Sequence, residues 1–317
     1  MNTTIRFHQY GGPEVLEVED DATPIPSAGQ VRPRHEAIGV NFIDTLFRQG
    51  AFPVPLPSVP GVEGVGIVEA LGSGVAGIKI GQRMAYYLAP GSYTQQRVIG
   101  VEHLVPVPDD LSAEQVAAVL TKGLTAWAAL NGYHQIKAGE TVLIQGASSA
   151  VGSLLARWAK AHGAIVIGTA GSTKKRAGLA SAIDHVLPPD APDLATHVRR
   201  FAPQGVDVVY EFVGKATFAA SVAAVRDGGT IASIGAASGT PEFDKSELAR
   251  RQIRMVGGPM ANHLQGRVAE ATAAVFDAYR CGLLGPVPVT RYALKDAAQA
   301  HLDIAERRKT GSLLLIP

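Results

Sequence analysis

The stretch Thr141-Val-Leu-Ile-Gln-Gly-Ala-Ser-Ser-Ala-Val-Gly152 decides how the rest of the chain is organised. Its first five residues are β-prone and uncharged, which is typical of a strand buried on both faces of a parallel sheet. A turn of small residues follows, and from Ala150 the apolar residues recur at helical spacing. This order suits a dinucleotide, because backbone N–H groups and the positive end of a helix dipole attract a pyrophosphate.

The glycine fingerprint of such turns, G-x-G-x-x-G, is weakened in this chain. Its span runs from Ala147 to Gly152, so only the last glycine is present. By itself the turn leaves an ordinary strand-to-helix connection open as an alternative. If a dinucleotide binds, the predicted contacts come from the whole turn: Gly146, Ala147, Ser148, Ser149, Ala150, Val151 and Gly152.

The composition is that of a globular chain large enough for two domains. Of its 317 residues, 46% are hydrophobic and 18% are charged. The 29 Lys and Arg residues balance 28 Asp and Glu residues, so neither nucleic acid nor a membrane is expected as a partner. A single cysteine, Cys281, excludes an internal disulfide framework and a multi-cysteine metal site. No apolar run matches a signal peptide or a membrane span, so a cytoplasmic protein is expected.

The first third of the chain reads as short strands separated by Gly and Pro turns. This pattern predicts a mainly β unit with a partly closed, barrel-like sheet. The expected strands are residues 5–9, 15–18, 30–38, 64–71, 83–88 and 93–98.

The pattern becomes helical at residue 112, and two helices are expected, over 112–120 and 124–130. Strands and helices then alternate from residue 141, which predicts parallel strands with crossover helices and an α/β, doubly wound Rossmann sheet. The expected strands are 141–145, 165–169, 185–187, 206–212, 230–234 and 253–256, and the expected helices are 174–182, 194–201 and 216–225.

The last part of the chain does not extend a doubly wound sheet. A long amphipathic helix is expected over 264–281, followed by an extended segment 286–292, a helix from 295 to about 307 and a strand over 312–316. We expect this part to return to the first domain. The predicted domains are therefore 1–122 and 260–317, which form a catalytic domain, with a nucleotide-binding domain 123–259 inserted between them.

The segment Ala170-Gly-Ser-Thr-Lys-Lys-Arg176 indicates which dinucleotide binds. An NAD-selective domain carries an Asp or Glu at this strand end, where it bonds the ribose 2′-hydroxyl. Here that position is Ala170, and cations follow it. Because a 2′-phosphate requires cations and is repelled by a carboxylate, the segment predicts NADPH, held by Ser172, Lys175 and Arg176. The alternative is a solvated, positively charged helix start.

Several motifs along the chain together point to a known family. They are Gly61-Val-Glu-Gly-Val-Gly-Ile-Val-Glu-Ala-Leu-Gly72, Lys79-Ile-Gly-Gln-Arg83, Lys122-Gly-Leu-Thr-Ala126, Gly139-Glu-Thr-Val-Leu143, Tyr210-Glu-Phe-Val-Gly214, Ala300-His301 and Gly311-Ser-Leu-Leu-Leu-Ile-Pro317. With these motifs the chain resembles the medium-chain dehydrogenase/reductases, and within them the zinc-independent quinone oxidoreductases of the zeta-crystallin-like branch. The resemblance runs nearly from end to end. It implies a GroES-like, barrel-like catalytic domain interrupted by a Rossmann domain.

No metal is expected. The positions that hold zinc ligands in zinc-dependent members are Asn41, Val62 and Thr121, and none of these side chains replaces a thiolate or an imidazole. The nine histidines are scattered along the chain without ligand spacing. Without a Lewis acid the enzyme is suited to an acceptor that is already electron-poor.

The resemblance also implies a set of site residues. It places Asn41 and Asp44 beside the nicotinamide and the substrate, Lys122 and Thr125 at the domain junction, and Gly235, Ser238 and Gly239 along the cofactor. Asn41 is expected to bond the carboxamide or an acceptor oxygen, and Asp44 to fix its loop. Close bacterial relatives have tyrosines where this chain has Leu46 and Phe52, so a more apolar acceptor pocket is expected, with Leu46, Phe52 and Trp127 as its walls.

The expected activity is NADPH-dependent hydride transfer to a quinone or a similar conjugated carbonyl compound, because such an acceptor spreads the developing charge itself. Two alternatives stay open. One is an enoyl or alkenal double-bond reductase; the other is a NADPH-binding structural or RNA-binding crystallin-like protein. The resemblance further implies a homodimer.

Overall fold

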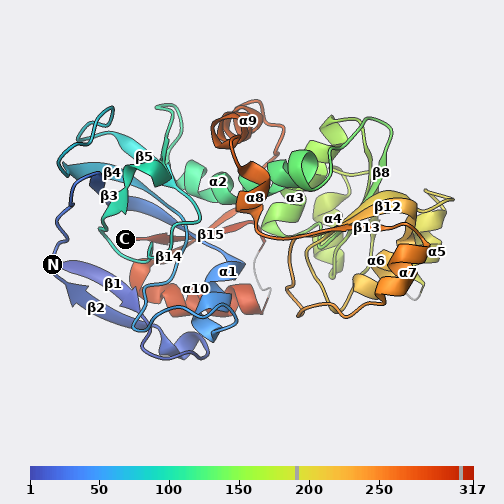
Figure 1. The fold of residues 1–317 in the computed structure, drawn as a ribbon, viewed down its shortest axis with the longest axis horizontal. Coiled ribbons are helices and arrows are strands. Elements are labelled where there is room, and N and C mark those ends of the chain that lie inside the picture. Colours follow the sequence, from blue (N-terminus) through green and yellow to red (C-terminus); the bar gives the residue numbers. More distant parts are fainter. Residues whose placement is uncertain (190–192, 307–309) are drawn as a thin grey trace. The chain divides into compact units, whose positions relative to one another are not determined.

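The computed structural model describes residues 1–189, 193–306 and 310–317, and the chain forms two compact units (Figure 1). The first unit combines Met1–Thr121 with Val287–Pro317, and the second is Lys122–Pro286. Because the first unit is built from both ends of the chain, the expected insertion of one domain into another is confirmed. The second boundary, expected at residue 260, lies between Pro286 and Val287.

The second unit contains a six-stranded sheet in the order β10-β9-β8-β11-β12-β13, with every neighbouring pair parallel. The strand that comes first in sequence is central, and the order reverses direction between β8 and β11. This is the doubly wound arrangement predicted from the alternating pattern. The strands are β8 (Thr141–Gln145), β9 (Ile165–Thr169), β10 (His185–Leu187), β11 (Val206–Glu211), β12 (Val225–Ser233) and β13 (Arg254–Val256).

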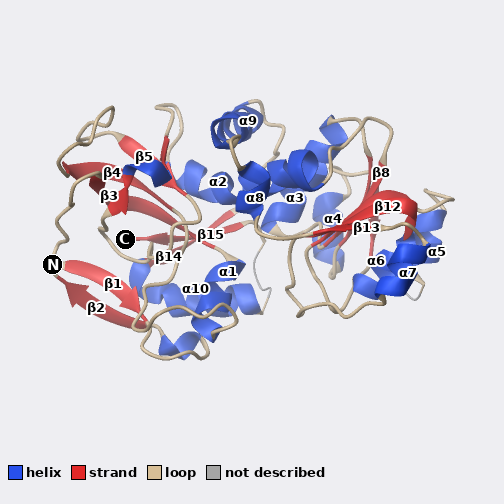
Figure 2. Ribbon diagram, viewed as in Figure 1, coloured by secondary structure: helices blue, strands red, loops and turns tan. Residues whose placement is uncertain are grey.

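Helices cover this sheet, with α3 packed on β8 and β9, and α6 packed on β11 and β12 (Figure 2). Apolar strand residues such as Leu143 and Val209 are buried against Val198 and Phe218 from the helices. The helices are α3 (Ala150–Ala161), α4 (Thr173–Leu179), α5 (Leu194–Arg199), α6 (Phe218–Ala224) and α7 (Lys245–Arg250).

The two helices expected over 112–130 are one, and the predicted break was wrong. Helix α2 (Ala113–Ala128) runs through Gly123 and continues into a π-helix, η3 (Ala129–Tyr133). Gly123 does not end the helix; it allows close packing, because a Cβ there would lie 2.6 Å from Cγ1 of Val275.

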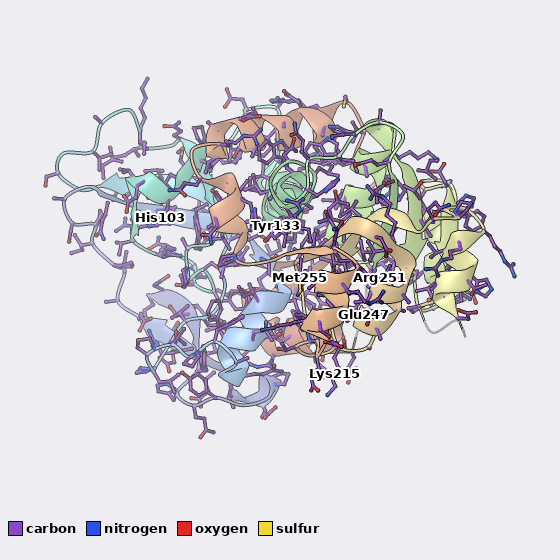
Figure 3. The ribbon with its side chains drawn as sticks, turned by 45° about the vertical axis from the view of Figure 1, so that its right-hand side comes forward. His103, Tyr133, Lys215, Glu247, Arg251 and Met255 are labelled. Carbon is purple, nitrogen blue, oxygen red and sulfur yellow. The ribbon has the colours of Figure 1, made fainter. Side chains whose placement is uncertain are left out.

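Residues 260–286 belong to the second unit, not to the first as expected. They form α8 (Met260–Leu264) and α9 (Val268–Arg280), and the predicted single helix is interrupted at Gly266, which has φ +73°. Tyr133, labelled in Figure 3, stacks on the ring of His263 with centroids 3.7 Å apart and donates its hydroxyl to the Gly258 carbonyl at 2.7 Å. Contacts of this kind attach the segment to η3, whereas its sequence pattern showed only an apolar face.

The first unit contains a seven-stranded sheet in the order β14-β15-β3-β4-β5-β7, with β6 paired to β3 outside this path. Strand β15 joins the C-terminal segment to the N-terminal one by pairing antiparallel with β3 and parallel with β14. The strands are β3 (Gln30–Val40), β4 (Gly64–Leu71), β5 (Arg83–Tyr86), β6 (Ile99–Gly100), β7 (Leu104–Pro106), β14 (Val289–Ala293) and β15 (Ser312–Ile316).

Three local elements of this unit differ from the predicted ones. The expected strand 93–98 makes only isolated bridges, at Thr94 and Gln96. Helix α1 (Phe42–Gln49) was not predicted, although Asn41 and Asp44 are well placed to begin it. The helix expected from 295 begins as a 3₁₀ turn and continues as α10 (Ala297–Ala305); its expected end at residue 307 lies outside the described residues.

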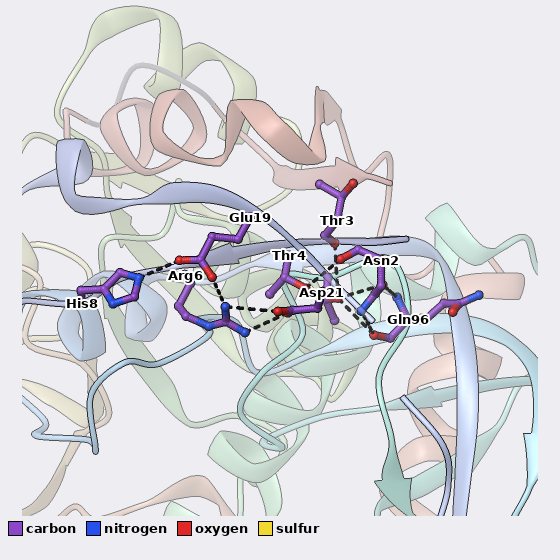
Figure 4. Close-up of polar contacts among 9 residues, drawn as sticks. Asn2, Thr3, Thr4, Arg6, His8, Glu19, Asp21 and Gln96 are labelled. Atoms are coloured by element: carbon purple, nitrogen blue, oxygen red, sulfur yellow. Dashed lines mark hydrogen bonds and ion pairs between the residues drawn. The ribbon is translucent and has the colours of Figure 1, made fainter. Parts of the chain in front are cut away.

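A two-stranded sheet, β1 (Asn2–Arg6) with β2 (Glu17–Asp21), stands apart from the larger one. Its surface carries a small charged cluster in which Arg6 bonds both Glu19 and Asp21, and His8 bonds Glu19 at 2.6 Å (Figure 4). Antiparallel pairing puts these side chains on one face, where opposite charges lie across the strands.

No helix in the described part of the chain is both long enough and apolar enough to cross a membrane.

The two helical glycines Gly123 and Gly178 should respond oppositely to alanine. Gly123→Ala should lower the free energy of unfolding by about 1 kcal/mol or more, because overpacking against Val275 outweighs the gain in helix propensity. Gly178→Ala should raise it by about 0.5–1 kcal/mol, because a Cβ at Gly178 meets no atom within 4 Å. Urea denaturation of both variants tests this; equal effects would show that Val275 does not constrain the helix.

Candidate active site

The turn after β8 is anchored to the end of the neighbouring strand β9. The N–H of Gly146 donates to the Thr169 hydroxyl at 3.1 Å, and the N–H of Ala147 donates to the Thr169 carbonyl at 3.0 Å. Gly146 has φ +77°, a conformation that favours glycine. The path of the turn is therefore determined before any ligand is considered.

Gly152, the one glycine left from the fingerprint, sits at the closest contact of the turn. A Cβ there would lie 2.4 Å from the carbonyl oxygen of Gly146. The Ser149 hydroxyl caps α3 by accepting from the N–H of Gly152 at 3.0 Å. Accepting this bond leaves the exposed hydroxyl its own hydrogen to donate, so Ser149 adds a donor beside the free N–H groups of the first helical turn.

A series of buried hydrogen bonds connects the turn after β8 to Glu211. Gly146 donates to Thr169, the Thr169 hydroxyl donates to Oε1 of Gln145 at 2.8 Å, and Nε2 of Gln145 donates to the Ser221 hydroxyl at 3.2 Å. The Ser221 hydroxyl then donates to Oε2 of Glu211 at 2.6 Å. Each group in this series donates to the next, and the series ends on the Glu211 carboxylate, which is 0% exposed.

Glu211 also organises the loop after its own strand, β11. Its Oε1 accepts from the N–H groups of Val213 and Gly214, at 2.8 and 3.0 Å, and from the Thr217 hydroxyl at 2.9 Å. A buried carboxylate is stable only when donors converge on it in this way. One side chain thus connects the C-terminal ends of β8, β9 and β11, the edge at which an open α/β sheet binds ligands.

The predicted cationic segment lies between the end of β9 and the first turns of α4. The guanidinium of Arg176 folds back over the turn and donates to the carbonyls of Ala170 and Gly171, at 3.3 and 3.4 Å, and to the Thr173 hydroxyl. These partners are neutral, so they orient the cation without cancelling its charge. Ser172 caps α4 by accepting from the N–H of Lys175 at 3.2 Å.

The loop after β12 is held to the loop after β11. The Ser238 hydroxyl donates to the Val213 carbonyl at 2.7 Å and accepts from the N–H of Ala216 at 2.9 Å. Gly239, with φ +104°, accepts from the N–H of Lys215 at 3.0 Å, and a Cβ at Gly235 would lie 2.7 Å from the Phe212 carbonyl oxygen. In this structure the predicted cofactor contacts Gly235, Ser238 and Gly239 join two loops.

In the first unit, Glu63 connects Asn41 and Thr121, two of the positions that hold zinc ligands in zinc-dependent members. Its carboxylate, 1% exposed, accepts from Nδ2 of Asn41 at 2.9 Å and from the N–H of Thr121 at 3.2 Å. Gly39 makes room for it, since a Cβ at Gly39 would overlap the Glu63 side chain. Val62 is buried and accepts from the N–H of Ala89 through its carbonyl. Hydrogen bonds to the Glu63 carboxylate therefore connect two of the three positions that hold zinc ligands in zinc-dependent members.

Asp44 closes the start of α1. Its Oδ2 accepts from the N–H of Asn41 at 2.8 Å and from the Tyr93 hydroxyl at 3.1 Å. Asp44 is 0% exposed, whereas Asn41 is half-buried and its side-chain amide is held by Glu63. The structure thus brings the predicted residues Asn41 and Asp44 together, with Asp44 as the supporting carboxylate.

The remaining predicted residues lie in separate surroundings. Lys122 is 3% exposed, and the Thr125 hydroxyl contacts the sulfur of Met260 at 3.1 Å. Trp127, expected as a pocket wall, is buried beneath the guanidinium of Arg267, 4.4 Å from its ring centroid. Phe52 is 49% exposed, and its ring centroid lies 6.0 Å from that of Phe47.

One group of potential metal ligands occurs among the described residues. His8, Glu17 and Glu19 present ligand atoms within 4.8 Å of one another, which their positions in sequence did not suggest. Arg6 and His8 already bond Glu19. A cation at this exposed group would compete with Arg6 for the same carboxylate.

Sequence reasoning missed the residues that support the site. Gln145, Thr169 and Ser221 were read only as parts of a strand or a helix, and Glu211 only as part of a strand and a family motif. The available signal was a polar residue at the last position of each of three apolar strands: Gln145, Thr169 and Glu211. Strand ends at one edge of a parallel sheet meet in space, so such residues are candidates for a shared network.

Two family models match the chain: the alcohol dehydrogenase GroES-like domain over residues 27–113 and the zinc-binding dehydrogenase over residues 150–277. A quinone oxidoreductase of Pseudomonas aeruginosa is 37% identical over the full length of both chains, and a 2-haloacrylate reductase of Burkholderia sp is 36% identical over 98% of each. The quinone oxidoreductase of Escherichia coli, solved in complex with NADPH, superimposes with a TM-score of 0.95 at 34% identity, over 99% of this chain and all of the other.

Replacing Glu211 by Gln tests the buried network. The amide puts an N–H group among four donors, so the free energy of unfolding should fall by about 1–3 kcal/mol in urea denaturation at neutral pH. Glu242→Gln is the matched control: its side chain is 90% exposed, so the change should stay within about 0.5 kcal/mol. If both variants unfold alike, Glu211 does not organise the strand ends.

Proposed function

The chain belongs to the zinc-independent quinone oxidoreductases of the medium-chain dehydrogenase/reductase superfamily, and on that basis we propose that it is a NADPH-dependent reductase of quinones or similar conjugated carbonyl compounds. The observation that carries the proposal is the pair of anion-binding features at one sheet edge. These are the turn that ends in Gly152 and the cationic segment after β9, which contains no carboxylate.

The residues of the second unit fit NADPH in two places. The close packing at Gly152 leaves the first-turn N–H groups of α3 and the Ser149 hydroxyl as donors for a pyrophosphate. After β9, Arg176 is oriented by neutral oxygens beside Ser172 and Lys175, as a 2′-phosphate requires. The solved Escherichia coli relative, in complex with NADPH, supports this assignment.

Bound NADPH supplies the hydride, and the residues of the chain orient the reactants. The bond from Asn41 to Glu63 turns the amide nitrogen toward the carboxylate, which leaves Oδ1 to accept from a carboxamide. The second amide hydrogen is then a donor for an acceptor oxygen. Asp44, which accepts from the Tyr93 hydroxyl, keeps Asn41 at the start of α1. From the family resemblance we assign Lys122 and Thr125 to contacts with the nicotinamide.

The chain offers no tyrosine at Leu46 or Phe52 to act as a proton donor. A quinone tolerates this, because the reduced product takes its protons from water once the hydride has arrived. The proposal includes Phe52, which is 49% exposed, as an apolar wall of the acceptor region.

A double-bond reductase is the second candidate, favoured by the similarity to a 2-haloacrylate reductase. In that reaction the hydride adds to an alkene conjugated with a carboxyl or carbonyl group, and the neighbouring carbon takes a proton. The product is a saturated compound, whereas a quinone gives a hydroquinone.

We also propose a cytoplasmic homodimer, as the family implies. Strand β13 lies at one end of the six-stranded sheet, paired only with β12, and carries the partly exposed Met255 (Figure 3). An edge strand of this kind offers unpaired backbone groups to a second copy. Sedimentation equilibrium tests this proposal, and a monomer at micromolar concentration contradicts it.

The activity is tested with purified protein, NADPH and a panel of quinones and conjugated enones. NADPH absorbance should decay with at least one acceptor, and mass spectrometry of the product distinguishes a hydroquinone from a saturated carbonyl compound. Tight NADPH binding without turnover of any acceptor would overturn the enzyme assignment. A nucleic-acid mobility shift at varied salt then tests the RNA-binding alternative, which the net charge of +1 disfavours.

Cofactor selectivity should depend on Lys175. Lys175→Glu should raise the Michaelis constant for NADPH at least about tenfold and that for NADH much less, because only NADPH carries the 2′-phosphate. Lys174→Glu makes the same charge change on the adjacent residue and should have a smaller effect. Equal effects on the two cofactors would place the 2′-phosphate elsewhere.

A further inference from the structure

A line of buried hydrogen bonds in the first unit leads from Arg48, in the last turn of α1, through His301 of α10 and Tyr93 to Asp44, in the first turn of α1. Arg48 Nη1 lies 3.2 Å from Nδ1 of His301, and Nε2 of His301 lies 2.9 Å from the Tyr93 hydroxyl. That hydroxyl donates to Oδ2 of Asp44 at 3.1 Å. All four side chains are at most 1% exposed. The line ends on the carboxylate that bonds the N–H of Asn41.

The partners determine where the proton of His301 lies. A guanidinium has only donors, so Nδ1 of His301 must accept from Arg48 and carries no hydrogen. The proton of the neutral ring is then on Nε2, which donates to the Tyr93 oxygen. The Tyr93 hydrogen is left to point at Asp44. Each bond thus sets the direction of the next.

The same unit contains a second buried tyrosine–histidine pair with the opposite arrangement. Nδ1 of His35 lies 2.6 Å from the Thr94 carbonyl oxygen, which only accepts, so this nitrogen carries the proton. Nε2 of His35 therefore accepts from the Tyr86 hydroxyl at 2.8 Å. The two pairs make similar bonds, but only the pair of His301 and Tyr93 bonds directly to Asp44.

The charges explain why His301 is neutral. Arg48 and Asp44 are a buried cation and a buried anion separated by two neutral side chains. Among the described residues, His301 bonds Arg48 and Tyr93, so a positive charge on its ring would lie beside a cation and a neutral hydroxyl. Burial and the neighbouring Arg48 charge lower the pKa of His301 to about 3, and burial with the Asp44 charge raises the pKa of Tyr93 well above its ordinary value. Both groups are thus neutral around pH 7.

We propose that His301 is a positioning residue, which as the Nε2–H tautomer directs the Tyr93 hydroxyl onto Asp44 and so holds Asn41 for the reaction. It touches neither the cofactor nor the acceptor. The inference rests on the proposed function for its kinetic consequence, but the tautomer and the bond directions stand independently of it.

The first test determines which ring nitrogen carries the proton in each of the two histidines, in the ¹⁵N-labelled full chain. Long-range ¹H–¹⁵N correlation spectra, assigned with single histidine variants, should show His301 protonated on Nε2 and His35 protonated on Nδ1. Neither ring should titrate between pH 5 and pH 8. A proton on Nδ1 of His301, or titration in this range, would overturn the proposal whatever the enzyme reduces.

The second test compares Tyr93→Phe with Tyr86→Phe by steady-state kinetics. Each variant removes one buried hydroxyl and one bond to a histidine. Tyr93→Phe should lower kcat/KM for the acceptor about tenfold, the loss expected for one well-placed hydrogen bond, and Tyr86→Phe should leave it nearly unchanged. Both melting temperatures should fall, and that of Tyr93→Phe should fall further because this variant also loses the bond to Asp44. Equal losses of kcat/KM would reduce His301 to a general core residue.

Conservative variants of His301 complete the test. Gln keeps a donor near the position of Nε2, whereas Asn keeps an acceptor near Nδ1 and loses the donor to Tyr93. His301→Gln should therefore retain more kcat/KM than His301→Asn, and the reverse order contradicts the proposal. If the wild-type chain reduces none of the acceptors, the proposed function fails while the tautomer assignment is still decided by the spectra.

Discussion

Buried carboxylates are the constraint on which the candidate site depends. A carboxylate removed from water is stable only when several donors converge on it, so its position determines the positions of the groups around it. Glu211 collects four donors and connects three strand ends in the second unit. Glu63 and Asp44 hold Asn41 from two directions in the first unit. In each unit, the groups proposed to contact a ligand are held in position by a buried carboxylate.

This arrangement separates two tasks that residues at a site perform. The turn at Gly152 and the segment around Arg176 present donors and positive charge outward, where a dinucleotide phosphate would find them. Gln145, Thr169 and Ser221 present nothing outward, yet they determine where the turn lies. At the positions that correspond to zinc ligands in zinc-dependent members, this chain has a hydrogen-bond network through Glu63 that holds the Asn41 side chain.

The sequence predicted much of the fold because local patterns encode it. The alternation from residue 141 gave the parallel sheet, and strands β4, β8, β9, β10 and β15 begin and end where expected. The errors occurred where packing overrides local preference. Two helices were expected over 112–120 and 124–130, but α2 runs through Gly123, which packs closely on Val275, and residues 260–286 joined the second unit through contacts such as that of Tyr133 with His263.

By itself, the sequence determined the fold class, the family and the loss of the zinc ligands, because periodicity and residue type can be read locally. It also determined the cationic segment after β9, where the missing carboxylate is visible one residue at a time. Only the tertiary structure decided which polar groups support the site. His301 lies 208 residues from Tyr93 in sequence, and Glu211 lies 66 residues from Gln145. A hydrogen bond needs its two atoms about 3 Å apart, and only the complete path of the chain brings such distant residues that close.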